Sequence, residues 1–441
     1  MNEEKELANV SSHSVDPAPT SPSSSLHRLP PKRLHDDHHC SLFYESGTLL
    51  QNPKKAKKSP QCDPLYPLPI LPHEILVEIL SWLPVRTLIQ FRCVSKSFKS
   101  LISDHEFIKT HLRKIKSFSG NKPNLYQRIV FTYGDLSLNL LKSCSLYSIF
   151  NNSQTDAAEL DHYSLEDRHR HHVYDWLVGS LDGVLCVAVK QNFVALWNPS
   201  TGVFNRMPDL GFGKKSGSYT VFGFGYDREI DDYKVVAVFC FQSSGVNGAI
   251  GYNTRVKVCS RLTESWKSIE GFRYGVPYDV SGKYVNGSLS WPVMCERDSV
   301  LTWIIVSFDL AKETYKEIVQ PNYGEPGYAR SLGVLDGCLC VMCNYSAVRA
   351  DIWVMKEYGV RESWTKLVSI PYLIEPEIGH LQYSVPYFIS DNGEILLELN
   401  SRLAIYNPKD GTFRYPVTNG SGNWVDAELY IESLVSPKIE N

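Results

Sequence analysis

The sequence predicts a mainly β fold: a disordered amino-terminal tail, a short module of three helices, and a kelch-like β-propeller of about six blades. Three observations support this prediction. Apolar residues recur at helical spacing in one short segment, the apolar period changes to two beyond about residue 120, and a turn-and-strand unit then repeats near every 50 residues. We therefore divide the chain into residues 1–64, 65–117 and 118–441.

The composition is that of a globular protein and excludes several function classes. Of 441 residues, 43% are hydrophobic and 21% are charged. The 45 basic and 48 acidic side chains give a net charge of -3, so we expect neither nucleic acid nor an anionic membrane as a partner. The 11 cysteines are too sparse for a disulfide framework, and no apolar stretch has the length of a membrane span. We expect an intracellular, soluble protein with reduced thiols.

The tail, residues 1–64, is rich in Ser, Pro, His and Asp and has no apolar periodicity. Such a segment buries too little apolar surface to offset its chain entropy, so we expect it to be disordered. It contains the basic run Lys54, Lys55, Lys57 and Lys58, which has the form of a nuclear import signal. A solvated charge run is the alternative interpretation. We expect the protein in the nucleus and the cytoplasm.

Residues 65–117 predict three short amphipathic helices. The first follows Pro72 and ends at Pro84, and Ser95 is a suitable N-cap for a later one. So small a module cannot hide all of its apolar side chains, so it needs a partner. It holds 8 Lys and Arg against 4 Asp and Glu, a net charge of +4, which favours an acidic partner.

Four turns mark the repeated unit of the β region. Their glycines, Gly183, Gly287, Gly337 and Gly393, lie 104, 50 and 56 residues apart, and each precedes a strand pattern. The interval of 104 has room for one diverged copy, which we place at 223–238.

Four strands and their turns need about 50 residues, which is the length of a blade of the kelch class. A late strand at 429–435 could pair with an early strand and close the ring, which would remove the sheet edges. A stacked β-sandwich is the alternative fold. It explains the alternation of apolar residues but not the spacing of the turns.

Both folded segments resemble a known family. Residues 71–85 and 91–102 resemble the F-box. The β region resembles the F-box-associated domain of the large plant F-box families, because it contains Asn-Pro-Ser-Thr-Gly at 198–202, Gly-Phe-Gly-Tyr-Asp at 223–227 and Glu-Ser-Trp at 264–266. Together the resemblance covers about 85% of the chain.

The resemblance implies a substrate-recognition subunit of an SCF-type E3 ubiquitin ligase. In that family the F-box docks on a Skp-type adaptor, and through it on a cullin-RING ligase, while the carboxyl-terminal domain selects the protein to be ubiquitinated. The residues that it implies on or under the adaptor-facing surface are Leu71, Pro72, Ile75, Ile79, Leu83, Pro84, Leu88, Val94 and Phe98. The alternative is a non-catalytic scaffold or ligand-binding propeller that acts outside the ubiquitin ligase.

We predict no catalytic residue, metal site or cofactor. No Ser, His and Asp constellation and no activated cysteine is recognisable. Cys338, Cys340 and Cys343 fall on an apolar strand without a second pair at zinc-binding spacing, so buried thiols are the better interpretation. His169, His171 and His172 lie in a polar loop, where solvated surface is favoured over a metal site.

The substrate-binding residues are unknown from the sequence. Aromatic side chains on blade loops are the candidates, because aromatic anchors dominate protein interfaces. Those beside Gly or Pro are Tyr323, Tyr328 and Tyr372. Ordinary packing within the turns is the alternative.

Overall fold

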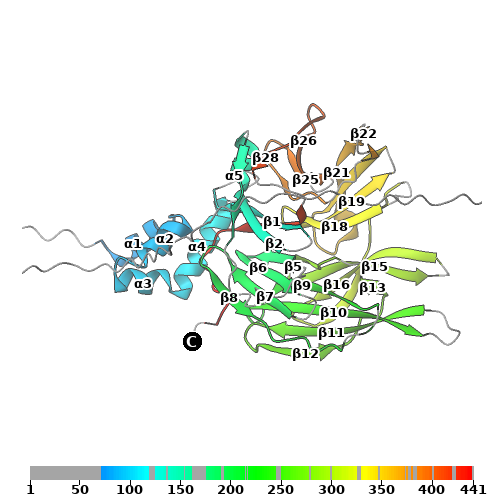
Figure 1. Ribbon diagram of the computed structural model, residues 1–441, viewed down its shortest axis with the longest axis horizontal. Coiled ribbons are helices and arrows are strands. Elements are labelled where there is room, and N and C mark those ends of the chain that lie inside the picture. The colour runs from blue at the N-terminus through cyan, green and yellow to red at the C-terminus, as the bar shows by residue number, and fades with distance from the viewer. Residues whose placement is uncertain are drawn as a thin grey trace, which may run out of the picture. The chain divides into compact units, whose positions relative to one another are not determined.

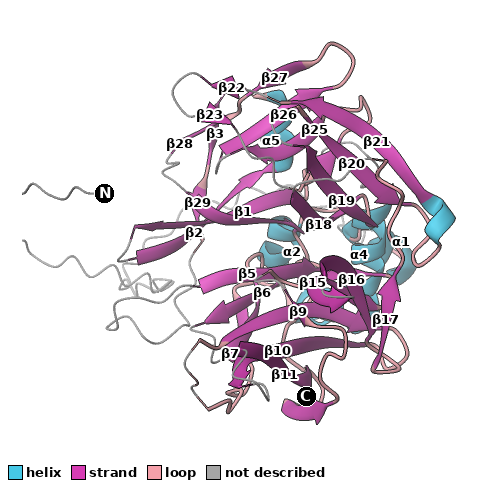
Figure 2. Ribbon diagram, turned by 90° about the vertical axis from the view of Figure 1, so that its right-hand side faces the viewer, coloured by secondary structure: helices cyan, strands magenta, loops and turns pink. Residues whose placement is uncertain are grey.

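Six antiparallel sheets follow one another along the described part of the chain and form the blades of a β-propeller (Figure 1, Figure 2). The prediction of about six blades is confirmed, and the β-sandwich alternative is wrong. The computed structural model describes residues 71–118, 125–135, 138–152, 154–160, 175–189, 193–213, 215, 217–244, 250–277, 280–297, 300–324, 329–345, 348–372, 374–375, 379–380, 385–399, 402–419 and 424–439.

The first four blades follow one another around the ring, each built from its innermost strand outward. The first holds β29 (Trp424–Ile431), β1 (Gln127–Asp135), β2 (Leu138–Ser145) and β4 (Ala158–Glu159), and the second holds β5 (Asp175–Leu181), β6 (Val184–Val189), β7 (Phe193–Asn198) and β8 (Val203–Arg206). The third holds β9 (Tyr219–Asp227), β10 (Asp232–Ser244), β11 (Ile250–Ser260) and β12 (Ser265–Ile269). In the fourth, β13 (Val276–Pro277) and β14 (Lys283–Val285) both pair with β15 (Ser288–Arg297), followed by β16 (Val300–Asp309) and β17 (Thr314–Ile318).

The last two blades complete the ring. The fifth holds β18 (Ala329–Leu335), β19 (Cys338–Tyr345), β20 (Arg349–Met355) and β21 (Trp364–Pro371), with the 3-10 turn η1 (Arg361–Ser363), and the sixth holds β24 (Phe388–Ile389), β25 (Ile395–Leu399), β26 (Arg402–Asn407) and β27 (Thr412–Arg414). The remaining elements are α5 (Leu146–Asn151), β3 (Gln154–Asp156) paired with β28 (Val417–Asn419), and β22 (Ile374–Glu375) paired with β23 (Gly379–His380).

Each repeated turn joins the first two strands of a blade, or β14 and β15 in the fourth, and those at Gly183, Gly287 and Gly337 are tight two-residue hairpins. In the Asp182-Gly183 turn both residues have positive φ, 55° and 83°, and in the Asp336-Gly337 turn they have 50° and 70°. Such turns match the twist of the flanking strands and favour an Asp or Asn followed by Gly. The diverged copy at 223–238 lies on β9 and β10, so its placement is confirmed.

The last strand closes the ring. β29 pairs with β1 from Gln127 opposite Ile431 to Tyr133 opposite Trp424. The predicted latch is therefore confirmed, but its predicted end at residue 435 is wrong, because the pairing stops at Ile431. Residues 432–437 leave the sheet, and we call them the carboxyl-terminal strap.

The core of the propeller lies between the blades. Six apolar clusters of described residues each join two neighbouring blades. Trp291 of β15, for example, is fully buried in a cluster with Val238 of β10. Each sheet therefore buries both faces, which explains why strands such as β6 are apolar throughout instead of alternating.

Four helices lie within the described residues 71–118 and form what we call the helical module: α1 (His73–Leu80), α2 (Val85–Phe91), α3 (Lys96–Ile102) and α4 (His105–Phe118). Pro72 and Pro84 stand directly before α1 and α2, and the Ser95 hydroxyl accepts a hydrogen bond from the Phe98 amide at the start of α3. The prediction of three helices missed α4. None of the described helices is long and apolar enough to cross a membrane.

Candidate functional site

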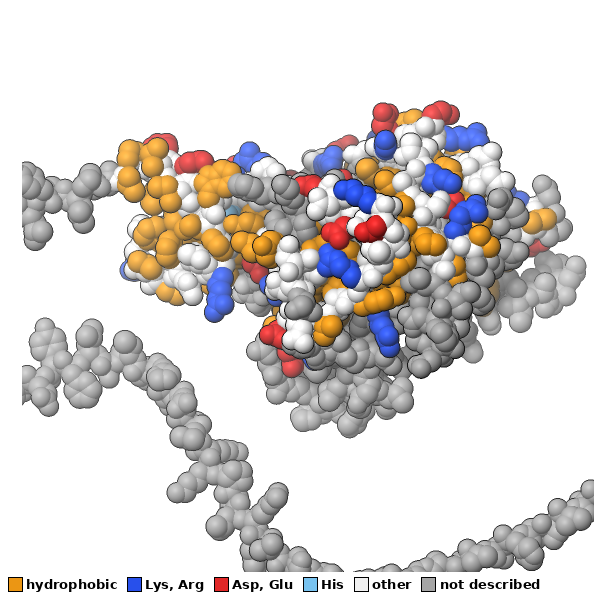
Figure 3. All heavy atoms as spheres, turned by 90° about the horizontal axis from the view of Figure 1, so that it is seen from above, with side chains coloured by type: hydrophobic (Ala, Val, Ile, Leu, Met, Phe, Trp, Pro, Cys, Tyr) orange, Lys and Arg blue, Asp and Glu red, His pale blue; other side chains and the backbone are white. Residues whose placement is uncertain are grey.

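One side of the helical module exposes large apolar side chains. Leu71, Ile75 and Ile79 on and before α1 are 54%, 47% and 48% exposed, Trp82 is 44% exposed, and Val94 is 67% exposed. We call these five residues the apolar face. Figure 3 shows hydrophobic side chains gathered over the helical module. Exposed large apolar groups that adjoin one another indicate an interaction surface.

The opposite side of the module is a packed core. Leu80, Val85, Leu88, Ile102, Phe107, Ile108 and Ile115 are buried there, together with Leu434 from the carboxyl-terminal strap. The module therefore completes its core with a residue that follows it by more than 300 positions. The residues of the apolar face stay exposed although the module has a complete buried core.

The nine predicted adaptor-facing residues gather on α1, on the connections between the first three helices, and beneath them. Six of them are exposed: Leu71, Pro72, Ile75, Ile79, Pro84 and Val94. Leu83 and Phe98 are half-buried, and Leu88 is fully buried under the surface. Whether they bind an adaptor stays a prediction.

Trp82 is the member of the apolar face that sequence reasoning missed. Its indole donates a hydrogen bond to Glu78 (2.8 Å), and the Lys114 ammonium lies 4.4 Å from its ring centroid. Hydrogen bonds from Lys114, which has the larger effect, and from Trp82 lower the pKa of the Glu78 carboxyl. Trp82 continues the helical spacing of Ile75 and Ile79, and this signal could have identified it.

Part of the positive charge of the helical module is neutralised by acidic side chains of the propeller. Lys109 pairs with Asp231 (2.7 Å) and Lys116 pairs with Asp182, and both aspartates lie on hairpin turns of the propeller. Lys96 and Lys99 on α3 are exposed, and no described carboxylate pairs with them. The charge available to steer an acidic partner is therefore smaller than the predicted +4, and it includes Lys96 and Lys99.

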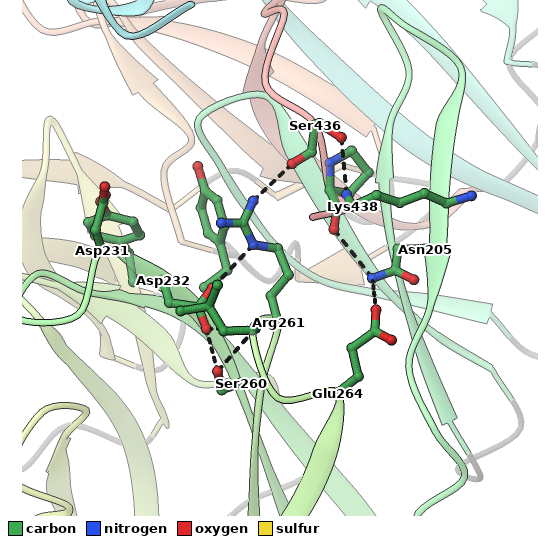
Figure 4. A network of polar contacts seen from close by, with 12 residues as sticks. Asn205, Asp231, Asp232, Ser260, Arg261, Glu264, Ser436 and Lys438 are labelled. Carbon is green, nitrogen blue, oxygen red and sulfur yellow. Dashed lines mark hydrogen bonds and ion pairs between the residues drawn. The ribbon is translucent and has the colours of Figure 1, made fainter. Parts of the chain in front are cut away.

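The carboxyl-terminal strap ties the helical module to the propeller. Three side chains of the second and third blades donate hydrogen bonds to carbonyl oxygens of the strap. These bonds join Asn198 Nδ2 to Val435 (2.8 Å), Asn205 Nδ2 to Pro437 (3.3 Å) and Arg261 Nη1 to Ser436 (3.1 Å). Figure 4 shows the last two. Arg261 is itself held by the buried Asp232 (3.1 Å), so the strap rests on a fixed polar network.

Two equivalent glycines test how closely the strap packs. A Cβ atom at Gly183 would lie 2.6 Å from the Ile431 carbonyl oxygen and would collide with Ser433, whereas a Cβ atom at Gly337 would meet nothing within 4 Å. Both substitutions to Ala strain a positive φ by about 1 kcal/mol. We expect Gly183→Ala to lower the free energy of unfolding by roughly 1–3 kcal/mol more than Gly337→Ala. Urea denaturation measures the difference, and equal losses would contradict the packing of the strap.

A cavity of about 1520 Å³ lies among the innermost strands of the propeller. Residues of β5, β9, β14, β18, β24 and β29 line it, so every blade contributes. Its wall combines aromatic and apolar side chains with a few charged groups, which is the character of many ligand sites.

Two carboxyl groups of β29 face one lysine in this cavity. Burial raises the pKa of Asp426 and raises that of Glu428 to about 7, while the Lys283 ammonium acts in the opposite direction. Asp426 accepts a hydrogen bond from the Leu177 amide (3.0 Å). The two carboxyl groups and Lys283 therefore partly compensate one another.

The raised pKa of Glu428 predicts a pH-dependent stability. Between about pH 4.5 and pH 7 the folded state keeps a proton that the unfolded state releases, so the free energy of unfolding falls as the pH rises. Glu428→Gln removes the titrating carboxyl, and with it the fall in the free energy of unfolding. As the pH rises from 4.5 to 8, we expect the free energy of unfolding of the variant to increase by roughly 1–3 kcal/mol relative to that of the unaltered chain. Urea midpoints at the two pH values check this, with the exposed Glu362→Gln as a control that keeps the same pH profile.

The other predicted residues lie in different surroundings. Tyr323 is half-buried, its hydroxyl donates to Gln320 (3.1 Å), and its ring packs edge-on against Trp353, so it is not the exposed anchor that was expected. Tyr372 is also half-buried. A substrate contact by either stays a prediction, and the contacts seen for Tyr323 are with its own turn and with Trp353 of β20. Tyr328, His169, His171, His172 and the basic run Lys54, Lys55, Lys57 and Lys58 lie outside the described residues.

The thiols agree with the interpretation as buried cysteines. Cys340 and Cys343 are buried and Cys338 is half-buried, and none of these three is in a disulfide. Burial raises the pKa of Cys340 to about 12, which makes it unreactive. The described residues contain no group of three or more His, Cys, Asp or Glu side chains placed to hold a metal ion.

Comparison with known proteins identifies the family. The model of the F-box domain matches residues 68–110, and that of the F-box associated beta propeller domain matches residues 137–436. The chain belongs to the F-box proteins with an F-box associated propeller. It is 35% identical over 378 residues to F-box/kelch-repeat protein At3g23880 of Arabidopsis thaliana, covering 83% of this chain and 96% of that protein. It is 32% identical over 391 residues to F-box protein CPR1 of the same plant, covering 83% and 88%.

The signatures of the F-box associated domain have structural roles in this chain. Asn198 of the first signature bonds the strap, and Glu264 of the third accepts a hydrogen bond from Asn205 (3.2 Å), which also bonds the strap. Asp227 of the second signature forms a buried ion pair with Lys234 (2.7 Å). Asn198 and Glu264 therefore help to hold the strap that joins the F-box to the propeller, and Asp227 stabilises the third blade.

Proposed function

We propose that the chain is the substrate-recognition subunit of an SCF-type E3 ubiquitin ligase. The observation that carries this proposal is the apolar face of the F-box, which stays exposed although the other side of the module is packed against the chain itself. Through this face the F-box binds a Skp-type adaptor, and through the adaptor a cullin-RING ligase. The propeller holds the protein to be ubiquitinated.

The energetics of the apolar face suit a specific partner. The five side chains are already about half buried, so burying the rest yields about 4–8 kcal/mol, against an association cost of about 4–15 kcal/mol. Apolar contact alone therefore at best offsets the association cost, and shape and charge decide which partner binds. The exposed Lys96 and Lys99 beside this face favour an acidic adaptor.

The chain contributes proximity and no chemistry of its own. Because the strap fixes the F-box to the propeller, a bound substrate is held at a defined place relative to the ligase. Such an arrangement converts an encounter between substrate and activated ubiquitin into an effectively intramolecular reaction.

Co-purification tests the proposal. The tagged full-length chain is expressed together with a Skp-type adaptor and a cullin, and we expect both to co-purify with it. If a folded chain retains neither protein, the proposal fails, and a ligand-binding propeller that uses the central cavity becomes the better account.

A further inference from the structure

Arg330 lies in the wall of the central cavity without an acidic partner among the described residues. It stands at the start of β18, and its guanidinium lies 4.5 Å from the ring centroid of Tyr323 and 5.8 Å from that of Trp303. Its Nε is buried without a hydrogen-bond partner, and no described carboxylate pairs with the side chain. Aromatic faces stabilise a guanidinium and keep its plane fixed, but they leave its N–H groups free to bond.

Neighbouring cations differ from Arg330 in having polar partners. Arg349 pairs with Asp351 (3.3 Å) and Arg297 pairs with Glu317 (2.5 Å). Arg228, also in the cavity wall, donates to Asn286 (3.3 Å). Lys283 interacts electrostatically with the two carboxyl groups of β29. A partly buried cation without such a partner is costly, and an incoming anion would offset that cost.

An exposed apolar side chain lies next to Trp303 on the same strand. Leu301 is 66% exposed and stands two residues before Trp303 on β16, so both project from the same face of the strand. Met294, which pairs with Trp303 across the sheet, also lines the cavity. Arg330 and the strand face of Trp303 therefore bring together one guanidinium without an anionic partner, aromatic rings and, two residues along the strand, exposed aliphatic surface.

We propose that Arg330, Trp303 and Leu301 form a subsite for an acidic segment of the protein substrate. The carboxylate of an Asp or Glu side chain accepts hydrogen bonds from Arg330, and a neighbouring apolar side chain packs on Leu301. This inference rests on the proposed function, because it names the chemistry of the substrate that the propeller would hold.

One guanidinium suits a carboxylate better than a phosphate. A carboxylate carries one negative charge, whereas a phosphate group carries nearly two and is recognised by clusters of arginines. No second described arginine without a partner adjoins Arg330, since Arg349 is engaged by Asp351. The carboxyl groups of Asp426 and Glu428 belong to β29 of the first blade, and the sixth blade separates them from β18 and Arg330.

Binding of peptide pools to the full-length chain tests the subsite. Four pools of fluorescein-labelled nonapeptides have Glu, Gln, phosphoserine or Lys at the centre and Leu two positions later, with the other positions randomised. Fluorescence anisotropy measures their affinities. We expect the Glu pool to bind about tenfold more tightly than the Gln pool, because one charge-assisted contact is gained. Equal affinities would overturn the proposal, and tightest binding of the phosphoserine pool would replace it with a phosphopeptide site.

Variants assign the preference to this arginine. Arg330→Ala should bring the affinities of the Glu and Gln pools together, and Arg330→Lys, which keeps the charge but not the planar stacking, should retain part of the preference. Arg297→Ala is the matched control: it removes a cation that has a carboxylate partner, and it should leave the preference intact. A preference that survives Arg330→Ala would overturn the subsite. Since no adaptor is present, this outcome is independent of whether the F-box binds one.

Discussion

Changing Ile75 and Ile79 together to Asp weakens binding of the Skp-type adaptor by at least about hundredfold. Each isoleucine exposes about half of its side chain on the apolar face, so burial of that half by a partner contributes roughly 0.8–1.5 kcal/mol. The double variant loses both contributions and places two carboxylates against the partner, which exceeds the 2.7 kcal/mol or so that a hundredfold change in affinity requires. Isothermal titration calorimetry with purified adaptor measures the loss.

The control for this prediction is an equal change elsewhere. Leu367 of β21 is 44% exposed on the propeller, so Leu367→Asp adds a carboxylate at a similarly exposed site and should leave adaptor affinity unchanged. Urea denaturation shows whether each variant is folded. A double variant that is folded and still binds the adaptor as tightly as the unaltered chain would show that the apolar face is not the docking surface.

Leu434→Ala should destabilise the F-box although residue 434 lies far from it in sequence. The side chain is 2% exposed and packs in the core of the helical module. Removal of a buried leucine costs about 2–5 kcal/mol, because both its contacts and its volume are lost. We expect the loss in urea denaturation, accompanied by faster amide exchange in α2 and α4.

Ile439→Ala is the matched control in the same segment. Ile439 is 39% exposed just after the strap, so its truncation should change the free energy of unfolding by less than about 0.5 kcal/mol. If Leu434→Ala were as mild as this control, the strap would not complete the core of the F-box. If α2 and α4 kept their exchange rates, the effect would belong to the propeller alone.

The fold was predictable where a local signal repeats. The Asp-Gly and Asn-Gly turns require positive φ, so Gly183 and Gly337 revealed the blade spacing directly. The strap was not predictable, because its bonds to Asn198 and Arg261 join positions more than 170 residues apart. Helix α4 was missed although Phe107, His111 and Ile115 follow helical spacing, because most of its other residues are polar and its apolar stripe is narrow.

The two candidate sites differ in how much of them the sequence shows. Ile75, Ile79 and Trp82 follow one another at helical spacing, so the apolar face can be read from the chain. Arg330 could not be singled out, because its isolation depends on contacts between distant residues: Tyr323 and Trp303 lie against it from a loop and a separate strand, and Asp351 is already engaged by Arg349. A charge without a partner is a property of the folded molecule.

Amide hydrogen exchange of the full-length chain, with and without a Skp-type adaptor, tests the central claim most directly. If the apolar face is the docking surface, adaptor binding slows exchange in residues 73–83 and 94–98 and leaves strands β25 and β26 of the sixth blade unchanged. Protection confined to the propeller, with the exchange of α1 unaltered, would contradict it.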